Sequence, residues 1–304
     1  MTILISQSSA FALLSGAFLM GACMVTDEPK STTQMREDSP LFAGVATYFD
    51  GHGSPYGGCG VPEHELDSMD FVALNVQNTP QEYTQYPSRP LNNQAIVGAW
   101  ENGKNCGRWV RVSMGDYCNN PKGHGELGRG LCPEGQWTAD EYNGRTLDMI
   151  VSDSCQDGNV WCRDSRHHLD MATGSLEKFG AGLSHKWGNR MVSWHFIEAP
   201  NYQGDIRIGF RQDSKPIWPA ITVTHLSNGL SGMEQEVAGS FQALRMESDM
   251  GQSYILLPTS NQVYRIRLYD TQHQLVQGGR IYEFSFPCNG SCSEPFNEVK
   301  YTTQ

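Results

Sequence analysis

Basic residues are scarce in this chain of 304 residues, and long apolar runs are almost absent. Lysine and arginine number 22 against 33 aspartates and glutamates, which gives a formal net charge of -11. This balance argues against nucleic acid as a partner, because phosphates need clusters of Lys and Arg, and it favours a neutral partner over a polyanion. The one apolar stretch is too short to span a bilayer, which excludes a membrane transporter.

Two kinds of catalytic motif are also missing. The sequence has no Gly-x-Ser-x-Gly nucleophile elbow and no glycine-rich phosphate loop, and it shows no internal repeat. What it has instead is 32 glycines, 15 prolines, 7 tryptophans, 12 tyrosines and 12 phenylalanines. This composition favours a turn-rich β protein and excludes disorder for most of the chain.

The first residues are uncharged and apolar. The stretch from Ala10 to Val25 predicts an export signal over residues 1–23. The small residues before Cys23 have the pattern of a lipobox, so Cys23 is a candidate for lipidation; ordinary cleavage nearby, with loss of Cys23, is the alternative. Residues 24–40 are predicted to be a polar linker. We therefore expect a secreted, extracellular protein, held at the outer membrane or cell surface only if Cys23 carries a lipid.

Cysteine usage supports export. Without Cys23 an even number remains, namely Cys59, Cys106, Cys118, Cys132, Cys155, Cys162, Cys288 and Cys292. In an exported chain this pattern predicts disulfides, and the short Cys288–Cys292 loop is the one local pairing that we expect. A zinc site is the alternative, and it is disfavoured because C-x-x-C and H-x-x-x-H pairs are missing. We expect no metal and no cofactor.

The mature chain divides into two segments of different character. Residues 41–190 have short β-like runs between long loops and helical character only at 171–180. Residues 191–287 alternate apolar and polar residues, which predicts an antiparallel sandwich, and the polar tail 288–304 is predicted to be irregular. The strands that we predict are 43–49, 71–76, 109–112 and 147–151 in the first segment, and 192–197, 205–210, 220–225, 241–245, 254–257, 263–269 and 279–286 in the second.

Two carboxyls are the candidate functional groups of the first segment. Asp153 follows a predicted strand, Asp170 opens the helix-like run, and the region of Cys155 and Cys162 turns the chain back between them. Two neighbouring carboxyls raise the pKa of one of them, which suits a general acid. For Asp170 the structural alternative is a helix N-cap.

Other polar and aromatic residues have competing interpretations. Asp50, among glycines, is typical of a turn. Trp218, next to a proline at a strand entrance, is a candidate to stack on a sugar ring, with a core position as the alternative. Trp194, within an alternating strand, is expected in the core. The histidines His64, His167 and His168 are expected to be exposed to solvent.

Several short motifs resemble the expansins. In the first segment these are Gly44-Val45-Ala46-Thr47-Tyr48, Gly57-Gly58-Cys59-Gly60, Val151-Ser152-Asp153-Ser154-Cys155 and His168-Leu169-Asp170-Met171-Ala172. In the second they are Val192-Ser193-Trp194-His195, Gly204-Asp205-Ile206-Arg207-Ile208 and Trp218-Pro219-Ala220-Ile221-Thr222-Val223. The match runs over 44–286, is poor across 77–145, and is specific because the motifs keep their order along two segments.

The resemblance implies a six-stranded double-psi β-barrel at 41–190 and an immunoglobulin-like, carbohydrate-binding sandwich at 191–287. It further implies a protein that binds plant cell-wall polysaccharide (cellulose, xyloglucan or another β-glucan) and loosens it without hydrolysis. We also expect a monomer. Thr47, Asp153 and Asp170 match the polar residues of the barrel groove, with Asp170 the essential one. The expected carbohydrate-binding aromatics are Tyr48, Trp218 and Tyr254.

Two other functions stay open. Inverting hydrolysis needs an acid and a base about 6.5–9.5 Å apart. Asp50 lies close to the position of the base in family-45 endoglucanases, which resemble expansins, so an endoglucanase or a peptidoglycan lytic enzyme with Asp170 as its acid is the alternative. A carbohydrate-binding protein with an inert barrel is the other. One tryptophan contributes about 1–2 kcal/mol by burial, which predicts weak cellulose binding.

Overall fold

The computed structural model describes residues 40–52, 57–62, 70–76, 98–122, 131–155, 161–162, 165–246 and 253–304. The predicted signal, residues 24–39 of the predicted linker, Cys23 and His64 lie outside these residues. Strands dominate the described parts of the chain, and none of their helices is both long and apolar enough to cross a membrane.

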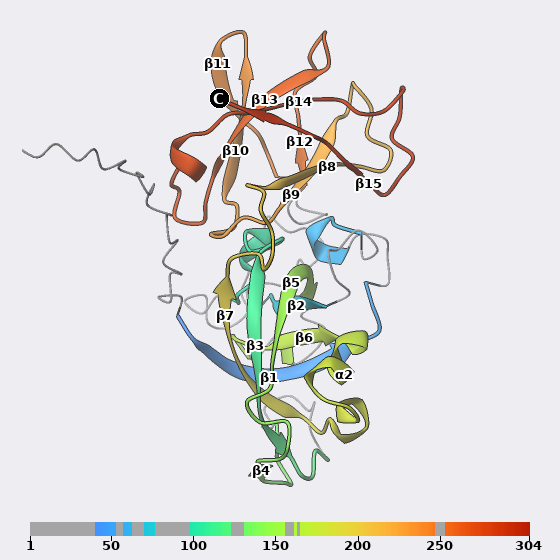
Figure 1. The fold of residues 1–304 in the computed structure, drawn as a ribbon, viewed down its shortest axis with the longest axis vertical. Coiled ribbons are helices and arrows are strands. Elements are labelled where there is room, and N and C mark those ends of the chain that lie inside the picture. Colours follow the sequence, from blue (N-terminus) through green and yellow to red (C-terminus); the bar gives the residue numbers. More distant parts are fainter. Residues whose placement is uncertain are drawn as a thin grey trace, which may run out of the picture. The chain divides into compact units, whose positions relative to one another are not determined.

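The first segment forms a closed barrel (Figure 1). Its hydrogen-bonded order is β3-β5-β2-β6-β1-β7, and β7 also pairs with β3, so the sheet closes on six strands as predicted; β4 extends β3 at one edge. The pairs β1–β6 and β2–β5 are parallel, and the others are antiparallel. The strands are β1 (Phe42–Phe49), β2 (Phe71–Asn75), β3 (Trp109–Cys118), β4 (Trp137–Thr138), β5 (Thr146–Cys155), β6 (Leu169–Ala172) and β7 (Arg190–Ile197).

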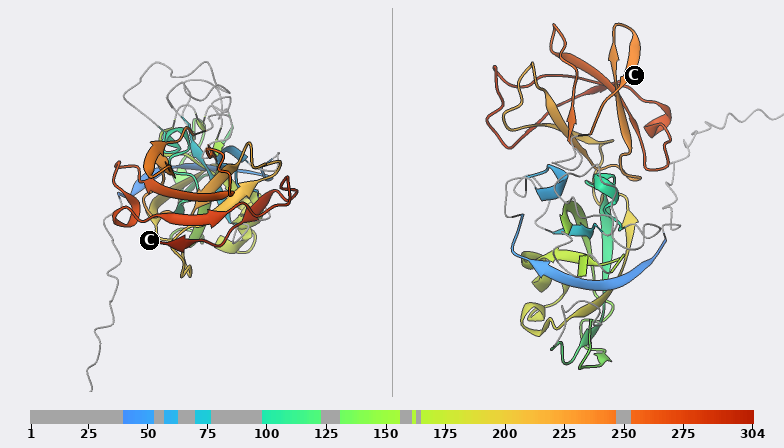
Figure 2. Two further views of the ribbon diagram at one scale, coloured as in Figure 1. Left: turned by 90° about the horizontal axis from the view of Figure 1, so that it is seen from above. Right: turned by 180° about the vertical axis from the view of Figure 1, so that it is seen from behind.

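The barrel interior explains why these runs are apolar. Strand β2 is buried at each of its five residues, and its sequence FVALN alternates only weakly because both of its faces are covered. The central cluster includes Leu74, Val110, Met149 and Leu169, all fully buried. Figure 2 shows β1, coloured blue, curving across this barrel.

The predicted strand at 192–197 belongs to the barrel, and its assignment to the second segment is wrong. Trp194 of β7 pairs with Phe42 of β1 on one side and with Val112 of β3 on the other. Its side chain is fully buried, as predicted for a core tryptophan. Alternation shows that one face of a strand is buried, but it does not show which sheet the strand joins.

The second segment is a sandwich of two antiparallel sheets, ordered β11-β10-β13-β14-β16 and β12-β9-β8-β15. The prediction of an irregular tail is wrong, because β15 pairs with β8 and β16 with β14, so that one tail strand extends each sheet. The strands are β8 (Arg207–Arg211), β9 (Ala220–Thr224), β10 (Gly232–Val237), β11 (Ser240–Ala243), β12 (Tyr254–Ile255), β13 (Val263–Tyr269), β14 (Tyr282–Ser285), β15 (Phe296–Glu298) and β16 (Thr302–Thr303).

All eight cysteines expected in disulfides are paired. The local pairing Cys288–Cys292 is confirmed. The other three bridges, which the sequence left open, are Cys59–Cys106, Cys118–Cys132 and Cys155–Cys162. Three of the four bridges therefore lie in the barrel, the part with the longer loops, where a covalent link restricts the unfolded chain.

Candidate functional site

Four adjacent strands place three of the predicted site residues in one row. Thr47 of β1 pairs with Asp170 of β6, Asp170 pairs with Ala73 of β2, and Ala73 pairs with Asp153 of β5. Residues that are paired across strands point to the same face. The two carboxyls therefore flank Ala73, whose small side chain is buried.

Asp170 lies within strand β6, so its interpretation as a helix N-cap is wrong. The predicted helical run is a strand, a 3-10 turn (Thr173–Ser175) and one short helix, α2 (Leu176–Phe179). The Oδ1 atom of Asp170 accepts a hydrogen bond of 2.9 Å from Thr47 Oγ1. Burial raises the pKa of Asp170 to about 6; the bond from Thr47 opposes this rise, and the charge of Asp153 adds to it.

Asp153 is held by backbone donors. Its Oδ1 accepts hydrogen bonds from the amides of Gly58 and Ser154. Burial raises its pKa to about 6, and these two bonds oppose the rise. A Cβ on Gly58 would lie 2.4 Å from Ser154 Oγ, and Gly57 has a φ of +54°, so the Gly57-Gly58 pair permits this close approach.

The structure adds a residue that sequence reasoning missed. His168 is fully buried rather than exposed, with Nε2 2.9 Å from Thr47 Oγ1. Burial lowers its pKa to about 3, with a backbone hydrogen bond to Val45 opposing, so the imidazole is neutral. His167 is partly buried. The spacing of the two residues is the signal that was overlooked. His168 precedes Asp170 by two residues, and side chains two apart in an extended strand point to the same face.

Asp50 lies outside this row. It is exposed at the end of β1, and its carboxylate accepts a 2.8 Å hydrogen bond from Thr173 Oγ1. The neighbouring charge that raises the pKa of Asp170 is Asp153 rather than Asp50.

The predicted sugar-binding aromatics differ in exposure. Tyr48 is 45% exposed and lies on the face of β1 opposite to Thr47. Its ring and that of Trp187 are nearly perpendicular, with their centroids 5.7 Å apart. Trp218 is 38% exposed beside Ile217, which is 80% exposed. The prediction for Tyr254 is wrong, because its ring is 1% exposed in the sandwich core and cannot stack on a sugar.

The zinc alternative meets a covalent obstacle. Donor atoms of Cys155, Cys162 and His168 lie within 4.8 Å of one another. The two sulfurs are joined to each other, and a disulfide sulfur is not the thiolate that zinc needs.

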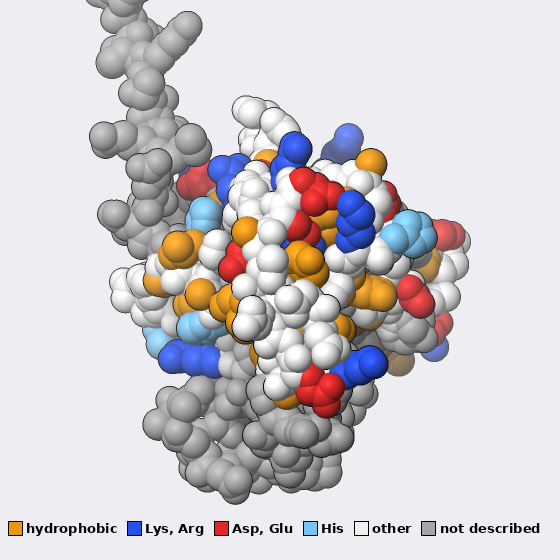
Figure 3. All heavy atoms as spheres, turned by 90° about the horizontal axis from the view of Figure 1, so that it is seen from below, with side chains coloured by type: hydrophobic (Ala, Val, Ile, Leu, Met, Phe, Trp, Pro, Cys, Tyr) orange, Lys and Arg blue, Asp and Glu red, His pale blue; other side chains and the backbone are white. Residues whose placement is uncertain are grey.

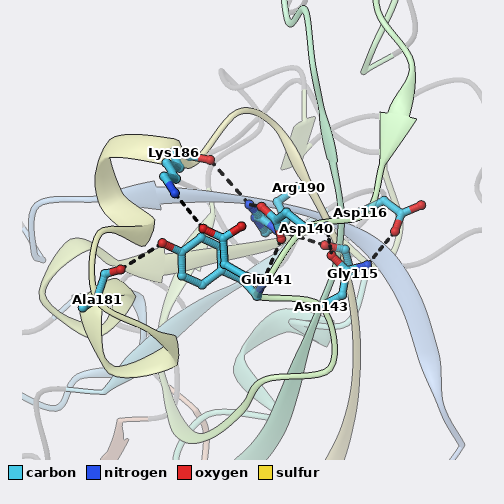
Figure 4. A network of polar contacts seen from close by, with 9 residues as sticks. Gly115, Asp116, Asp140, Glu141, Asn143, Ala181, Lys186 and Arg190 are labelled. Carbon is cyan, nitrogen blue, oxygen red and sulfur yellow. Dashed lines mark hydrogen bonds and ion pairs between the residues drawn. The ribbon is translucent and has the colours of Figure 1, made fainter.

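A paired charge lies elsewhere in the barrel (Figure 4). The side chain of Arg190, which is fully buried, donates to both oxygens of Asp140, at 3.0 and 2.6 Å, and to the carbonyls of Gly115 and Lys186. Hydrogen bonding to Arg190 lowers the pKa of Asp140. Arg190 pairs with Ala46 next to Thr47, so this ion pair fixes the strand that carries the site.

On the face that Figure 3 shows, the charges are mixed in sign. Figure 3 views the molecule from below, and the acidic and basic side chains drawn there lie interspersed among apolar ones. A face of this kind offers no concentrated field to a highly charged polymer, in keeping with the preference for a neutral partner.

Comparison with known proteins identifies the fold. No family model matches the sequence, and no curated protein matches it. The structure is similar to that of the apo expansin of Clavibacter michiganensis, with a TM-score of 0.52, 16% identity, and coverage of 86% of this chain and 96% of that one. An aspartate-to-asparagine variant of the same expansin, in complex with cellohexaose, gives a TM-score of 0.51 at 15% identity, with the same coverage. The chain therefore has the expansin fold, a double-psi β-barrel followed by a β-sandwich.

Proposed function

We propose that this chain is an expansin-like protein that binds plant cell-wall β-glucan and loosens it without hydrolysis. The observation that carries the proposal is the row of Thr47, Asp170 and Asp153. Among the described residues, no lysine or arginine pairs with either carboxyl. Partly buried carboxyls without a cation are costly to keep, which is typical of a site that serves a ligand.

The row suits a neutral, hydroxyl-rich polymer. Carboxyl oxygens accept hydrogen bonds from sugar hydroxyls, and each bond that involves a charged group contributes about 1.5–3 kcal/mol. A few such bonds along the barrel would compete with the weak contacts between neighbouring glucan chains. A variant of a structurally similar expansin forms a complex with cellohexaose, which supports a β-1,4-glucan as the ligand here.

Hydrolysis has weaker support. An inverting enzyme needs a second carboxylate as base, with room for a water molecule. Asp50, the candidate base, is held by Thr173 at an exposed position outside the row. The charge of Asp153 raises the pKa of Asp170, but Asp153 already accepts hydrogen bonds from two backbone amides.

The sandwich adds a second, weaker contact. Trp218 is its exposed aromatic candidate, and the exposed Ile217 beside it offers apolar area without a ring. We expect weak binding to crystalline cellulose in consequence. The four disulfides suit an oxidising, extracellular setting, and anchoring through Cys23 stays part of the proposal.

The test is cellohexaose binding by calorimetry together with reducing-end release from cellulose, xyloglucan, β-1,3/1,4-glucan and peptidoglycan. We expect binding that weakens at least tenfold in Asp170→Ala, and no new reducing ends. Reducing ends that disappear in Asp50→Ala would replace the proposal with a hydrolase. Binding that is equal in wild type and Asp170→Ala would indicate an inert barrel.

A further inference from the structure

The hydroxyl of Thr47 lies between two partners. Its oxygen is 2.9 Å from Asp170 Oδ1 and 2.9 Å from His168 Nε2. A hydroxyl group has one proton to donate and two lone pairs to accept with. Thr47 therefore donates to one of these neighbours and accepts from the other, which links the proton position on His168 to the charge on Asp170.

Two arrangements satisfy these distances. With Asp170 ionised, Thr47 donates to the carboxylate, so His168 must carry its proton on Nε2 and donate it to Thr47. With Asp170 protonated on Oδ1, the acid donates to Thr47, Thr47 donates to Nε2, and the proton of His168 must be on Nδ1. The second state holds one more proton, taken up from solvent by Asp170. The imidazole is neutral in both states. In passing from the first to the second it releases the proton on Nε2 to solvent and takes up a proton on Nδ1 from solvent.

The surroundings of His168 favour a neutral ring that can hold its proton on either nitrogen. The ring is fully buried, and among the described residues Nδ1 makes no hydrogen bond of good geometry. The backbone of Val45 is the group that acts on the pKa of His168 against burial. Its carbonyl is therefore the acceptor at hand for a proton on Nδ1.

Within the part of the chain that the structure describes, few other charges face this chain of hydrogen bonds. From β5 comes Asp153, which raises the pKa of Asp170. Strand β2 has no titratable residue, and the one in β1, Tyr48, points to the opposite face. Beyond His168, the ring of Trp161 stacks at 6.4 Å, and Cys155, whose Sγ lies 3.6 Å from Asp170 Oδ2, is held in a disulfide.

We propose that His168 is a positioning residue whose tautomer follows the protonation state of Asp170 through Thr47. The chain keeps the proton of Asp170 on Oδ1, directed at Thr47, and leaves Oδ2 as an acceptor in both states. Resting on the proposed function, this implies that Asp170 offers glucan an acceptor rather than an acidic proton, which is the role that loosening without hydrolysis needs.

The test is nitrogen-15 NMR of the histidine rings in the mature chain without sugar, with the His168 signals identified by their loss in His168→Gln. We expect the Nε2-protonated tautomer at pH 8 and the Nδ1-protonated tautomer at pH 5. The midpoint pH of this change should equal the midpoint pH at which the carboxyl signal of Asp170 titrates. Asp170→Asn does not titrate, and its side-chain amide presents one atom to Thr47 at every pH, so this variant should show the same tautomer at pH 8 and at pH 5.

Two variants separate coupling from simple structure. Thr47→Val should abolish the pH-dependent change of tautomer, and Thr47→Ser should retain it, with folding checked in each from the backbone amide spectrum. The inference is overturned if the pH-dependent change of tautomer persists in Asp170→Asn or in Thr47→Val. Since no sugar is present, either result leaves the proposed glucan binding to its own test.

Discussion

The barrel contains a buried ion pair, Arg190 with Asp140, and a pair of partly buried carboxyls, Asp153 and Asp170, and the two pairs differ in how their charge is balanced. Arg190 and Asp140 neutralise each other, and their pairing lowers the pKa of Asp140. Asp153 and Asp170 have no cation among the described residues, and burial raises both of their pKa values to about 6. The first arrangement stabilises the strand next to Thr47. The second carries a cost in stability, and a ligand that supplies hydrogen-bond donors can offset it.

The largest effect should come from breaking the neutralised pair. Arg190→Met leaves Asp140 and two carbonyls without their buried donor, so we expect a loss of about 3–5 kcal/mol in the free energy of unfolding, measured with denaturant. Lys186→Ala is the matched control, because it removes an exposed ion pair with Glu141 and should change little. Equal losses in the two variants would contradict the role assigned to Arg190.

The approach of the backbone to Asp153 gives the next effect. Gly58→Ala places a Cβ 2.4 Å from Ser154 Oγ. We expect a loss of about 1–3 kcal/mol in stability by overpacking, together with weaker cellohexaose binding, because the loop that donates to Asp153 must shift. Gly174→Ala, with nothing within 4 Å of the new atom, should be neutral. A stable, fully binding Gly58→Ala would remove this loop from the site.

Neutralising the unpaired carboxyls should have the opposite sign from breaking the ion pair. Asp153→Asn and Asp170→Asn should each raise the free energy of unfolding at pH 7 by about 1–2 kcal/mol while weakening glucan binding. Asp140→Asn, which leaves Arg190 without its counterion, should destabilise the chain. A loss of stability in both site variants would show that the two carboxyls are structural.

The same carboxyls set a pH dependence. Their folded pKa values of about 6 lie above the ordinary value of 3.8, so the folded state binds more protons than the unfolded state between these limits. Stability from these groups is therefore greatest below about pH 4 and declines as pH rises to about 6. Unfolding curves across this range should show a shallower decline in Asp153→Asn and Asp170→Asn than in wild type, and equal slopes would contradict the assignment.

The smallest effect concerns the sandwich. Trp218→Ala should weaken binding to insoluble cellulose several-fold without changing stability, because about 1–2 kcal/mol of ring burial is lost. Ile217→Trp, which adds an exposed ring at the neighbouring position, should strengthen binding in the same pull-down assay. Unchanged binding in both variants would assign all recognition to the barrel.

The sequence predicted the two carboxyls of the site but not the buried histidine that lies beside them. Asp153 and Asp170 stood out from their local pattern, and parallel and antiparallel pairing through Ala73 brings them into one row. His168 was missed because its burial depends on contact with β1, far away in sequence. A Cβ on Gly44, for example, would lie 2.2 Å from the carbonyl oxygen of His167.

The errors at strand level have a common cause. Strand 192–197 and Tyr254 were read correctly as extended segments, but the sheet that a strand joins and the face that is buried depend on its partners. Tyr254 pairs with Ile221 of β9, and its ring points into the sandwich core. The tail strand β15 was unpredictable because Phe296 packs over Gly209, a contact between residues 87 positions apart along the chain.

The most direct test of the central claim is extension of a clamped, heat-inactivated plant wall strip, with reducing ends measured in the same bath. We predict that wild-type protein extends the strip without releasing reducing ends, that Asp170→Ala loses most of this extension, and that Asp50→Ala keeps it. Extension that is always accompanied by reducing ends, and that is lost in Asp50→Ala, would contradict loosening by hydrogen bonding at the carboxyl row.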